Sequence, residues 1–294
     1  MGALEATGGV PYRGSLWRVR STAVTGYWAF ITNGTSDTAI VQIYDSCIIN
    51  MTTVGQHTSF YKGTITVINS EFVSKSSGER AGVIFNANIT AYHLTNVKFS
   101  NPAALYTFKT PATCVGITTN NASYGAYTTV SGVTVTDLDA KAASLTTYAR
   151  NGYGGASQLK FVNPTDGTGT RTAYHLTAAK LEIDNAAGEI WEQRTFDVHV
   201  ANAAGANLEG ASVTLKDVGG NTVTGFPQTT ASTGKITQQI VTYRTWTGTS
   251  ETLAEKGPFV MTITMAGYRT LIYENILLDA KVNLYVEMPD GGAQ

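Results

Sequence analysis

A six-residue template that recurs along the first two thirds of the chain constrains the fold most strongly. It consists of an apolar residue, any residue, Asp/Asn/Ser, any two residues and a second apolar residue. The segment TAYHLTNVKF at 90–99 also returns as TAYHLTAAKL at 172–181. Successive copies start 24, 24, 27, 41 and 41 residues apart, which is typical of stacked coils. The copies begin at Val19, Ile43, Val67, Leu94, Val135 and Leu176.

The segments around the template have the pattern of short strands. VQIYD, ITVIN and VTVTD alternate apolar and polar residues, as half-buried strands do. The third template position carries Asp45, Asn69, Asn96 and Asp137, residue types that tolerate the left-handed backbone of a tight corner. The sequence therefore predicts an all-β chain with a right-handed parallel β-helix over residues 1–190. A β-sandwich with accidental similarity between its strands is the alternative.

The two 41-residue steps predict long excursions from the stack, at about 100–130 and 141–171. These segments are rich in Gly, Ser, Asn and Tyr, which is the composition of adaptable contact loops. An equal alternative is that the tyrosines seal the excursions onto the flank of the stack. The predicted contact residues are Tyr106, Tyr124, Tyr127, Tyr148 and Tyr153.

From residue 195 the pattern changes to strands separated by turns every 8–12 residues, which indicates an antiparallel β-sandwich over 195–290. Gly188–Arg194 is the expected linker between the two domains. The insert 241–257 carries Trp246, which we expect to be a further contact residue. The segments that predict strands are TFDVHV, ASVTLKD, KITQQIVTY, FVMTITM and VNLYVEM.

This C-terminal third resembles the carboxypeptidase regulatory-like, or prealbumin-like, β-sandwich family. The resemblance implies an Ig-like sandwich without catalytic residues, of the kind used as a spacer, docking or adhesive module. It rests on Gly210–Leu215, Gly220-Asn221, Thr229-Thr230, Gly234–Ile236, Pro258-Phe259 and most of all on Ile263–Tyr268, which ends in Gly-Tyr after a central strand.

The fifth template position forms a column with alternating charge. Glu71 and Asp139 would stand two coils, or about 10 Å, apart with Lys98 between them. The cation would lower the pKa of both carboxyl groups, so this arrangement favours cross-strand stabilisation over acid catalysis. Asp137 and Asp139 could hold a cation, although such a pair more often caps a turn. The whole column is Ala23, Cys47, Glu71, Lys98, Asp139 and Lys180.

The sequence predicts no metal, cofactor or nucleophile site. His93 and His175 would lie about 10 Å apart, on either side of the coil of Thr134, too far to share a zinc ion. Neither His57 nor His199 has a Cys or carboxylate at ligand spacing. The two cysteines, Cys47 and Cys114, have no paired histidine signature, and Gly152–Gly155 opens no helix that could cradle a phosphate.

Composition excludes several classes of partner. Charged residues make up 14% of the chain and the net charge is -1, which argues against binding a phosphate backbone or an anionic membrane. No apolar run approaches the ~18 residues of a membrane span. The first residues, MGALEATGGVPYRG, have neither the basic nor the apolar region of a secretory signal.

Low charge, a Thr/Asn-rich surface and this pairing of domains resemble bacteriophage virion proteins. The resemblance implies a non-enzymatic structural protein of the virion, with capsid decoration preferred. Its partners would be other virion proteins and further copies of itself, with a trimer compatible with an open β-helix end. The alternatives are a tail spike or fibre module that binds or degrades host surface glycan, and a bacterial cell-surface adhesin.

Overall fold

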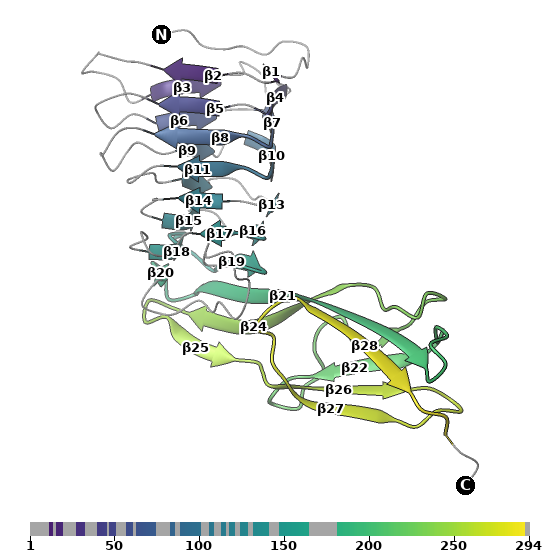
Figure 1. The fold of residues 1–294 in the computed structure, drawn as a ribbon. Helices are drawn as coiled ribbons and strands as arrows, with labels where there is room; N and C mark the ends of the chain where they lie inside the picture. Colours follow the sequence, from purple (N-terminus) through teal and green to yellow (C-terminus); the bar gives the residue numbers. More distant parts are fainter. Residues whose placement is uncertain are drawn as a thin grey trace. The chain divides into compact units, whose positions relative to one another are not determined.

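The computed structural model is all-β, with several sheets and no helix among the residues that it describes (Figure 1). By contacts it divides into two compact units: Met1–Trp191 with Trp246–Thr252, and Glu192–Thr245 with Leu253–Gln294. The described residues are 12–13, 16–19, 28–32, 40–45, 47–50, 57–60, 63–74, 83–85, 89–100, 106–108, 113–115, 118–120, 124–128, 132–140, 147–164 and 181–291.

In the first unit, consecutive strands are distributed over three sheets, so that each sheet takes every third strand from β1 to β18. The strands are stacked in tiers along the unit (Figure 1). One sheet contains β1 (Tyr12–Arg13), β4 (Ile40–Tyr44), β7 (Gly63–Ile68), β10 (Ile89–Thr95), β13 (Thr113–Val115), β16 (Val133–Thr136), β19 (Ser157–Val162) and the start of β21 (Gly188–Asn202).

The other two sheets follow the same rule. All of their strand pairs are parallel, like the pairs from β1 to β19 in the first sheet. The second contains β2 (Leu16–Val19), β5 (Cys47–Asn50), β8 (Glu71–Ser74), β11 (Lys98–Ser100), β14 (Thr118–Asn120) and β17 (Asp139–Ala140). The third contains β3 (Trp28–Thr32), β6 (His57–Phe60), β9 (Val83–Phe85), β12 (Tyr106–Phe108), β15 (Tyr124–Thr128), β18 (Thr147–Asn151) and β20 (Leu181–Ile183).

The core of the first unit consists of apolar columns that run from strand to strand. Ile43 pairs with Val67, Val67 with Leu94, and the column continues through Cys114 to Val135 and Phe161. Val67, Val135 and Phe161 are fully buried. Period-2 alternation explains this, because successive side chains of a strand point to opposite faces. The template positions Ile43, Val67, Leu94 and Val135 therefore lie in register, as the repeat predicts.

The polar template position forms the corner that follows each of these strands. Asp45, Asn69, Asn96 and Asp137 have φ angles of 49°, 50°, 52° and 52°. Asn163, the equivalent residue after β19, has a φ of 50°. Asn and Asp are among the few side chains that adopt this left-handed conformation readily. The sequence expectation for Asp45, Asn69, Asn96 and Asp137 is confirmed.

Both segments expected to be excursions, 100–130 and 141–171, contain strands of the stacked sheets. Cys114 pairs with both Leu94 and Val135, so the step from 94 to 135 contains two coils that meet at 114. Strands β12 to β15 occupy much of 100–130, and β18 and β19 lie within 141–171. The residue after Val115 is Gly116, which breaks the template but, like Asn, permits a left-handed corner.

The first copy of the template is also misplaced. Val19 pairs with Asn50, whereas the partner of Ile43 in the preceding coil is Tyr12. Tyr12-Arg13-Gly14-Ser15-Leu16-Trp17 matches the template once Gly is accepted at the corner position. Ala23, Leu176 and Lys180 lie outside the described residues.

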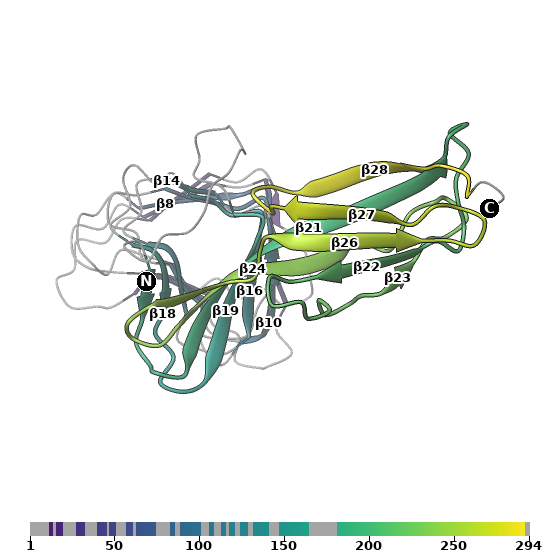
Figure 2. The same cartoon turned by 90° about the horizontal axis from the view of Figure 1, so that it is seen from below.

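The second unit contains two sheets that enclose one core (Figure 2). The antiparallel sheet has the strand order β23 (Gln228–Thr229), β22 (Ser212–Lys216), β26 (Phe259–Thr264) and β27 (Leu271–Ile276). The other is formed by β21 with β24 (Gln239–Thr247), β25 (Thr252–Glu255) and β28 (Val282–Met288). The core includes Phe196, Val198, Val213, Leu215, Val241, Phe259, Met261, Ile263 and Val286.

Two details differ from the sequence expectations for this region. Strand β28 pairs with β21 in parallel, from Phe196↔Val282 to Asn202↔Met288, so the strands are not all antiparallel. The expected linker Gly188–Arg194 is the first half of the 15-residue strand β21. Buried and half-buried residues alternate from Gly188 to Glu192, as in a strand, and Gly188 needs to be small because a Cβ there would lie 2.8 Å from Ile183 Cγ2.

Candidate functional site

The corner residues of the first unit stack their side chains as well as their backbones. Asn69 Nδ2 donates to Asp45 Oδ1 at 3.2 Å, and Asn96 Nδ2 donates to Asn69 Oδ1 at 3.1 Å. Asn163 Nδ2 donates in the same way to Asp137 Oδ1, at 3.3 Å. Each amide uses the acceptor of the coil before it. These hydrogen bonds between corner side chains therefore help to hold successive layers of the stack together.

Part of the column of alternating charges that the sequence predicts is present in the structure. Glu71 pairs with Lys98 in register, and Lys98 Nζ lies 3.0 Å from Glu71 Oε1. The next residue of the column is Thr118, which pairs with both Lys98 and Asp139. Glu71 and Asp139 are therefore three strands apart, or about 14 Å, and not two. Such a separation exceeds that of a glycosidase carboxylate pair, which is at most about 9.5 Å.

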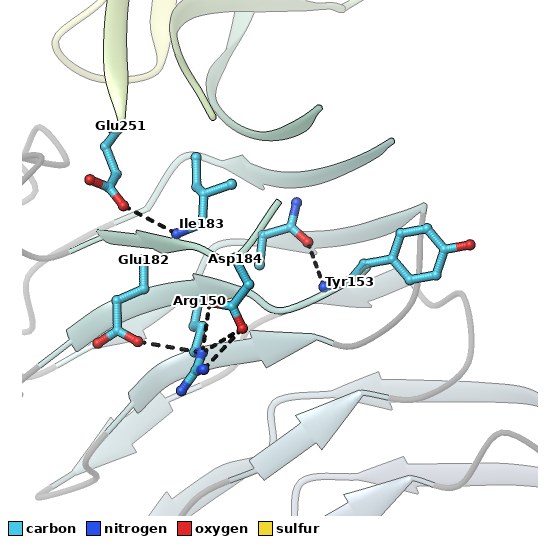
Figure 3. A network of polar contacts seen from close by, with 7 residues as sticks. Arg150, Tyr153, Glu182, Ile183, Asp184 and Glu251 are labelled. Atoms are coloured by element: carbon cyan, nitrogen blue, oxygen red, sulfur yellow. Dashed lines mark hydrogen bonds and ion pairs between the residues drawn. The ribbon is translucent and has the colours of Figure 1, made fainter. Parts of the chain in front are cut away.

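A cluster of polar side chains in the first unit lies where β18, β20 and the following turn meet (Figure 3). Arg150 pairs in register with Glu182, and its Nε lies 3.4 Å from Glu182 Oε2. The same guanidinium contacts the Asp184 carboxylate, with Nη2 2.9 Å from Oδ2. Arg150, Glu182 and Asp184 are 31%, 42% and 37% exposed, so solvent screens these ion pairs.

A buried amide next to this cluster fastens the last coil. Asn151 is fully buried, and its Oδ1 accepts from Ser157 Oγ at 2.9 Å and from the Tyr153 backbone at 3.4 Å. Its Nδ2 donates to the Glu189 carbonyl at 2.9 Å. Glu251 Oε1, from the segment 246–252, accepts from the Ile183 backbone at 3.3 Å (Figure 3). The Asn151 side chain thus joins its own strand β18 to the loop after it, to β19 and to β21.

The outer face near the end of the stack carries a second polar group. Lys160 Nζ lies 4.8 Å from the centroid of the Trp191 ring, a cation–π contact. Trp191 Nε1 donates to Glu189 Oε2 at 2.8 Å, and Gln158 Nε2 donates to the same oxygen at 3.0 Å. The hydrogen bonds satisfy the indole donor and hold the ring over which the lysine lies.

Four of the predicted contact residues lie on three neighbouring strands of one sheet. Tyr106 lies in β12, Tyr124 and Tyr127 lie in β15, and Tyr148 lies in β18, all within the third sheet. Tyr153 is half-buried, in the loop between β18 and β19.

Trp246, the remaining residue predicted to make contacts, lies in β24 and is only 1% exposed. A tryptophan in a Thr- and Gly-rich segment gives no sequence signal that separates a buried anchor from an exposed one.

The histidines and cysteines lie apart. His93 is exposed on β10, where it pairs in register with Thr66 and Thr113, and His175 lies outside the described residues. His57 is in β6, whereas His199 is in β21 of the second unit. Cys47 pairs with Glu71, and Cys114 pairs with Leu94. The described residues bring no three His, Cys, Asp or Glu side chains together as a group that could hold a metal ion.

A pair of buried charges stands at the start of the second unit. Glu192 is fully buried and Arg194 is 1% exposed, and Arg194 Nη2 donates to Glu192 Oε1. Arg194 Nη1 also donates to the Gln193 carbonyl at 3.1 Å, and its Nε donates to the Asp279 carbonyl at 3.4 Å. Burial is tolerable because each charge has a partner of opposite sign, which offsets the desolvation cost.

Tyr243 in β24 is the described residue whose titration is clearly displaced. Burial raises the pKa of the Tyr243 phenol above its ordinary value of 10.0, and nearby Arg244 partly opposes that rise. The guanidinium carbon of Arg244 lies 4.9 Å from the ring centroid. Arg244 itself forms an ion pair with Glu255, with 2.8 Å between Nη2 and Oε1.

The second unit also exposes large apolar side chains at the edge of its antiparallel sheet. β27 is the last strand in the order of that sheet. Ile272 and Tyr273 on this strand are 61% and 39% exposed, and Leu277 just after it is 53% exposed. This surface, defined by Ile272, Tyr273 and Leu277, is the β27 edge. The sequence expectations missed it, although the run LIYENILL gave an apolar signal.

Among the described residues, no helix has the length and apolar character needed to cross a membrane. Comparison with protein families, curated proteins and solved structures finds no match to this chain.

Proposed function

We propose that this chain is a non-enzymatic structural protein on the surface of a bacteriophage particle, most simply a capsid decoration. In this proposal the stacked strands of the first unit form a right-handed parallel β-helix. The second unit is an Ig-like sandwich of the carboxypeptidase regulatory-like type. The β27 edge is the observation that carries the proposal, because it combines an edge strand with exposed apolar side chains.

Edge strands expose unpaired N–H and C=O groups, and many proteins protect them with charged residues or proline. β27 has one charged residue, Glu274, but it also carries Ile272 at 61% exposure and Tyr273 at 39%, and Leu277 follows at 53%. Large apolar side chains left exposed on an edge strand are typical of surfaces that contact other proteins. The low charge of the chain supports the same interpretation, since protein interfaces are depleted in charge at their centres.

The outer face of the stacked strands supports a structural role in a second way. Thr66, Thr134 and Thr136 are half-buried on strands whose alternate residues, Ile65 and Val135, are fully buried. Hydroxyl side chains occupy outward positions at which many proteins place Lys or Glu. When such a surface packs against neighbouring proteins, few charged groups have to be desolvated, which lowers the free-energy cost of the contact.

Mass spectrometry of purified phage particles, made from cells that carry the gene, tests the location. The proposal predicts a fixed copy number of this chain per particle, retained through a density gradient. Recovery of the chain only from the soluble part of the lysate would remove the proposal.

A surface variant tests the β27 edge itself. Ile272→Lys places a charge on the edge strand and should weaken binding of the full chain to particles that lack it, measured by co-sedimentation. Val218→Lys is the matched control, because Val218 is 60% exposed but lies outside β27. Equal binding of the Ile272→Lys chain and the unmodified chain would rule out this edge as the contact.

A further inference from the structure

A cavity of about 400 Å³ lies on the outer face of the second unit, over the parallel pair β21 and β28. Its volume is within the range of small-molecule pockets. The cavity is lined by Asp197, Val198, His199, Lys235, Asn283, Leu284 and Tyr285.

Strand register arranges the polar lining residues in two rows. Asp197 pairs with Asn283, and His199 pairs with Tyr285, so the four side chains form a two-by-two array on one face. Lys235 extends the second row, because it is bridged to His199 from the opposite side. The row Tyr285–His199–Lys235 therefore crosses three adjacent backbone segments.

A glycine brings the third segment close to β21. Gly234 has a φ of +71°, and its backbone carbonyl accepts from the Val200 N–H at 2.7 Å. A Cβ at Gly234 would lie 2.5 Å from the Val200 carbonyl oxygen and 2.9 Å from the His199 ring. Glycine at this position is what allows Lys235 to stand beside His199.

Two of the polar side chains are oriented by partners outside the rows. Gln238 Nε2 donates to Asp197 Oδ2 at 2.7 Å. His199 Nε2 lies 2.7 Å from Asn207 Oδ1. Since an amide oxygen only accepts, the imidazole donates from Nε2 in this contact. The array is held in place before any ligand arrives, which lowers the entropic cost of binding.

The aromatic member of the array is open to solvent. Tyr285 is 54% exposed, and it meets His199 edge to face with ring centroids 5.0 Å apart and an interplanar angle of 84°. A T-shaped contact engages at most one face of the tyrosine ring, so the other face remains for a ligand.

We propose that this array, the β21–β28 pocket, binds a neutral saccharide. A sugar ring presents C–H groups on its face, which pack on an aromatic ring, and hydroxyl groups at its edge, which both donate and accept. Tyr285 supplies the ring, Asp197 accepts, Lys235 donates, and the Asn283 amide does both. One carboxylate and one ammonium leave the lining without net charge, which disfavours a phosphorylated or strongly acidic ligand.

The proposal is independent of location on a phage particle, because it rests on this unit alone. Saturation-transfer NMR on the full chain tests it with glucose, galactose, mannose, rhamnose, N-acetylglucosamine and their disaccharides at millimolar concentrations. We expect transfer to at least one of these sugars, with shifts of the Asn283 side-chain amide. Transfer to none of them would overturn the proposal.

Variants locate the site. Tyr285→Ala and Asn283→Ala replace exposed side chains, and each should lower the affinity for the sugar at least about tenfold. Asp197→Asn keeps the shape of the side chain and should lower the affinity for the sugar too. Tyr273→Ala is the matched control, since Tyr273 is exposed on β27 of the same unit but outside the pocket, and it should bind normally. Equal weakening by the control, or none by Tyr285→Ala, would contradict the assignment.

A comparison of ligands tests the chemical class. Glucose 6-phosphate and glucuronic acid should bind no more tightly than glucose. Tighter binding of either anion would overturn the neutral-saccharide assignment, because it would make Lys235 the dominant contact.

Discussion

At the scale of single residues, the left-handed corners carry most of the information about the fold. For most residues with a Cβ, that backbone conformation costs about 1 kcal/mol or more in free energy, and for Asn and Asp the cost is lower. Five corners of the first unit have Asn or Asp with φ near 50°. Four of them, Asp45, Asn69, Asn96 and Asp137, were predicted from the sequence because the backbone dictates the residue type.

The corner at Asn96 gives a direct test of this cost. Asn96→Ala should lower the free energy of unfolding by about 1–2 kcal/mol, since alanine lacks both the tolerance for this φ and the amide that donates to Asn69. Asn96→Gly should cost less than about 1 kcal/mol, because glycine adopts the conformation freely. Urea unfolding followed by circular dichroism measures both. Equal losses would show that the side-chain hydrogen bond, and not the backbone, sets the residue type.

The raised pKa of Tyr243 predicts that the stability of the folded chain depends on pH. Its pKa in the folded chain lies above the ordinary 10.0, because burial disfavours the phenolate. The stabilisation from the neutral phenol is therefore complete below pH 10.0 and is lost as the pH rises through the folded-state pKa. Tyr243→Phe cannot ionise, so it should lose less stability than the unmodified chain between about pH 9 and pH 11.

Urea unfolding across that alkaline range provides the measurement for Tyr243. Tyr273→Phe is the matched control because Tyr273 is exposed, and it should follow the unmodified chain. If Tyr243→Phe also followed the unmodified chain, burial of the phenol would not be the cause of the alkaline loss.

At the scale of elements, the sequence predicted the strands that match the whole template and missed those that depart from it. Ile43, Val67, Leu94 and Val135 share a column as expected. The coil that starts at Phe161 was missed because its sixth template position is Asp166 and not an apolar residue. The coil at Cys114 was missed because Gly116 stands where the template requires Asp, Asn or Ser. Glycine and asparagine solve the same backbone problem, and a template that accepts both recovers Tyr12 as well.

The candidate contact sites were harder to predict than the strands. Tyr124 and Tyr127 were assigned to an excursion because the template skipped a coil, and they lie in the regular strand β15. Strand β27 alternates poorly between apolar and polar residues, so no period marks it as an edge. Exposure of Ile272 depends on the neighbours of the strand, which pattern alone does not specify.

The buried amide of Asn151 tests how the last coil is fastened. Asn151→Ala removes hydrogen bonds to Ser157, Tyr153 and Glu189 and leaves buried partners unsatisfied. We expect a loss of about 2–4 kcal/mol in the free energy of unfolding. Asn185→Ala is a comparator whose hydrogen bonds to Gly154 and Ala187 are exposed, and it should cost about 1 kcal/mol or less. Similar losses in urea unfolding would contradict the special role of Asn151.

At the scale of the whole molecule, the chain consists of two units with separate cores. Phe161 is fully buried in the first unit and Phe259 in the second. A Phe→Ala change in a core typically costs about 3–5 kcal/mol. Phe161→Ala should speed amide hydrogen exchange mainly in the strands β16 and β19, and Phe259→Ala mainly in β22 and β26. Equal acceleration throughout the chain by either variant would mean that the two units unfold as one.

The low charge of the chain also belongs to this scale. Charged residues make up only 14% of the sequence, and threonine occupies outward positions on β7 and β16. The polar side chains of the first unit mostly serve its own stacking, as with Asn69, Lys98 and Asn151. Surfaces left with hydroxyls and apolar groups suit contact with other proteins, and this is the basis of the proposed structural role.

The central claim is that this chain is a structural component of a phage particle, and cryo-electron microscopy of purified particles tests it most directly. We predict density for stacked strands about 4.8 Å apart, joined to a smaller two-sheet unit, at every equivalent site of the particle surface. Particles from a strain with the gene deleted should lack this density. Identical maps from the two strains would contradict the claim.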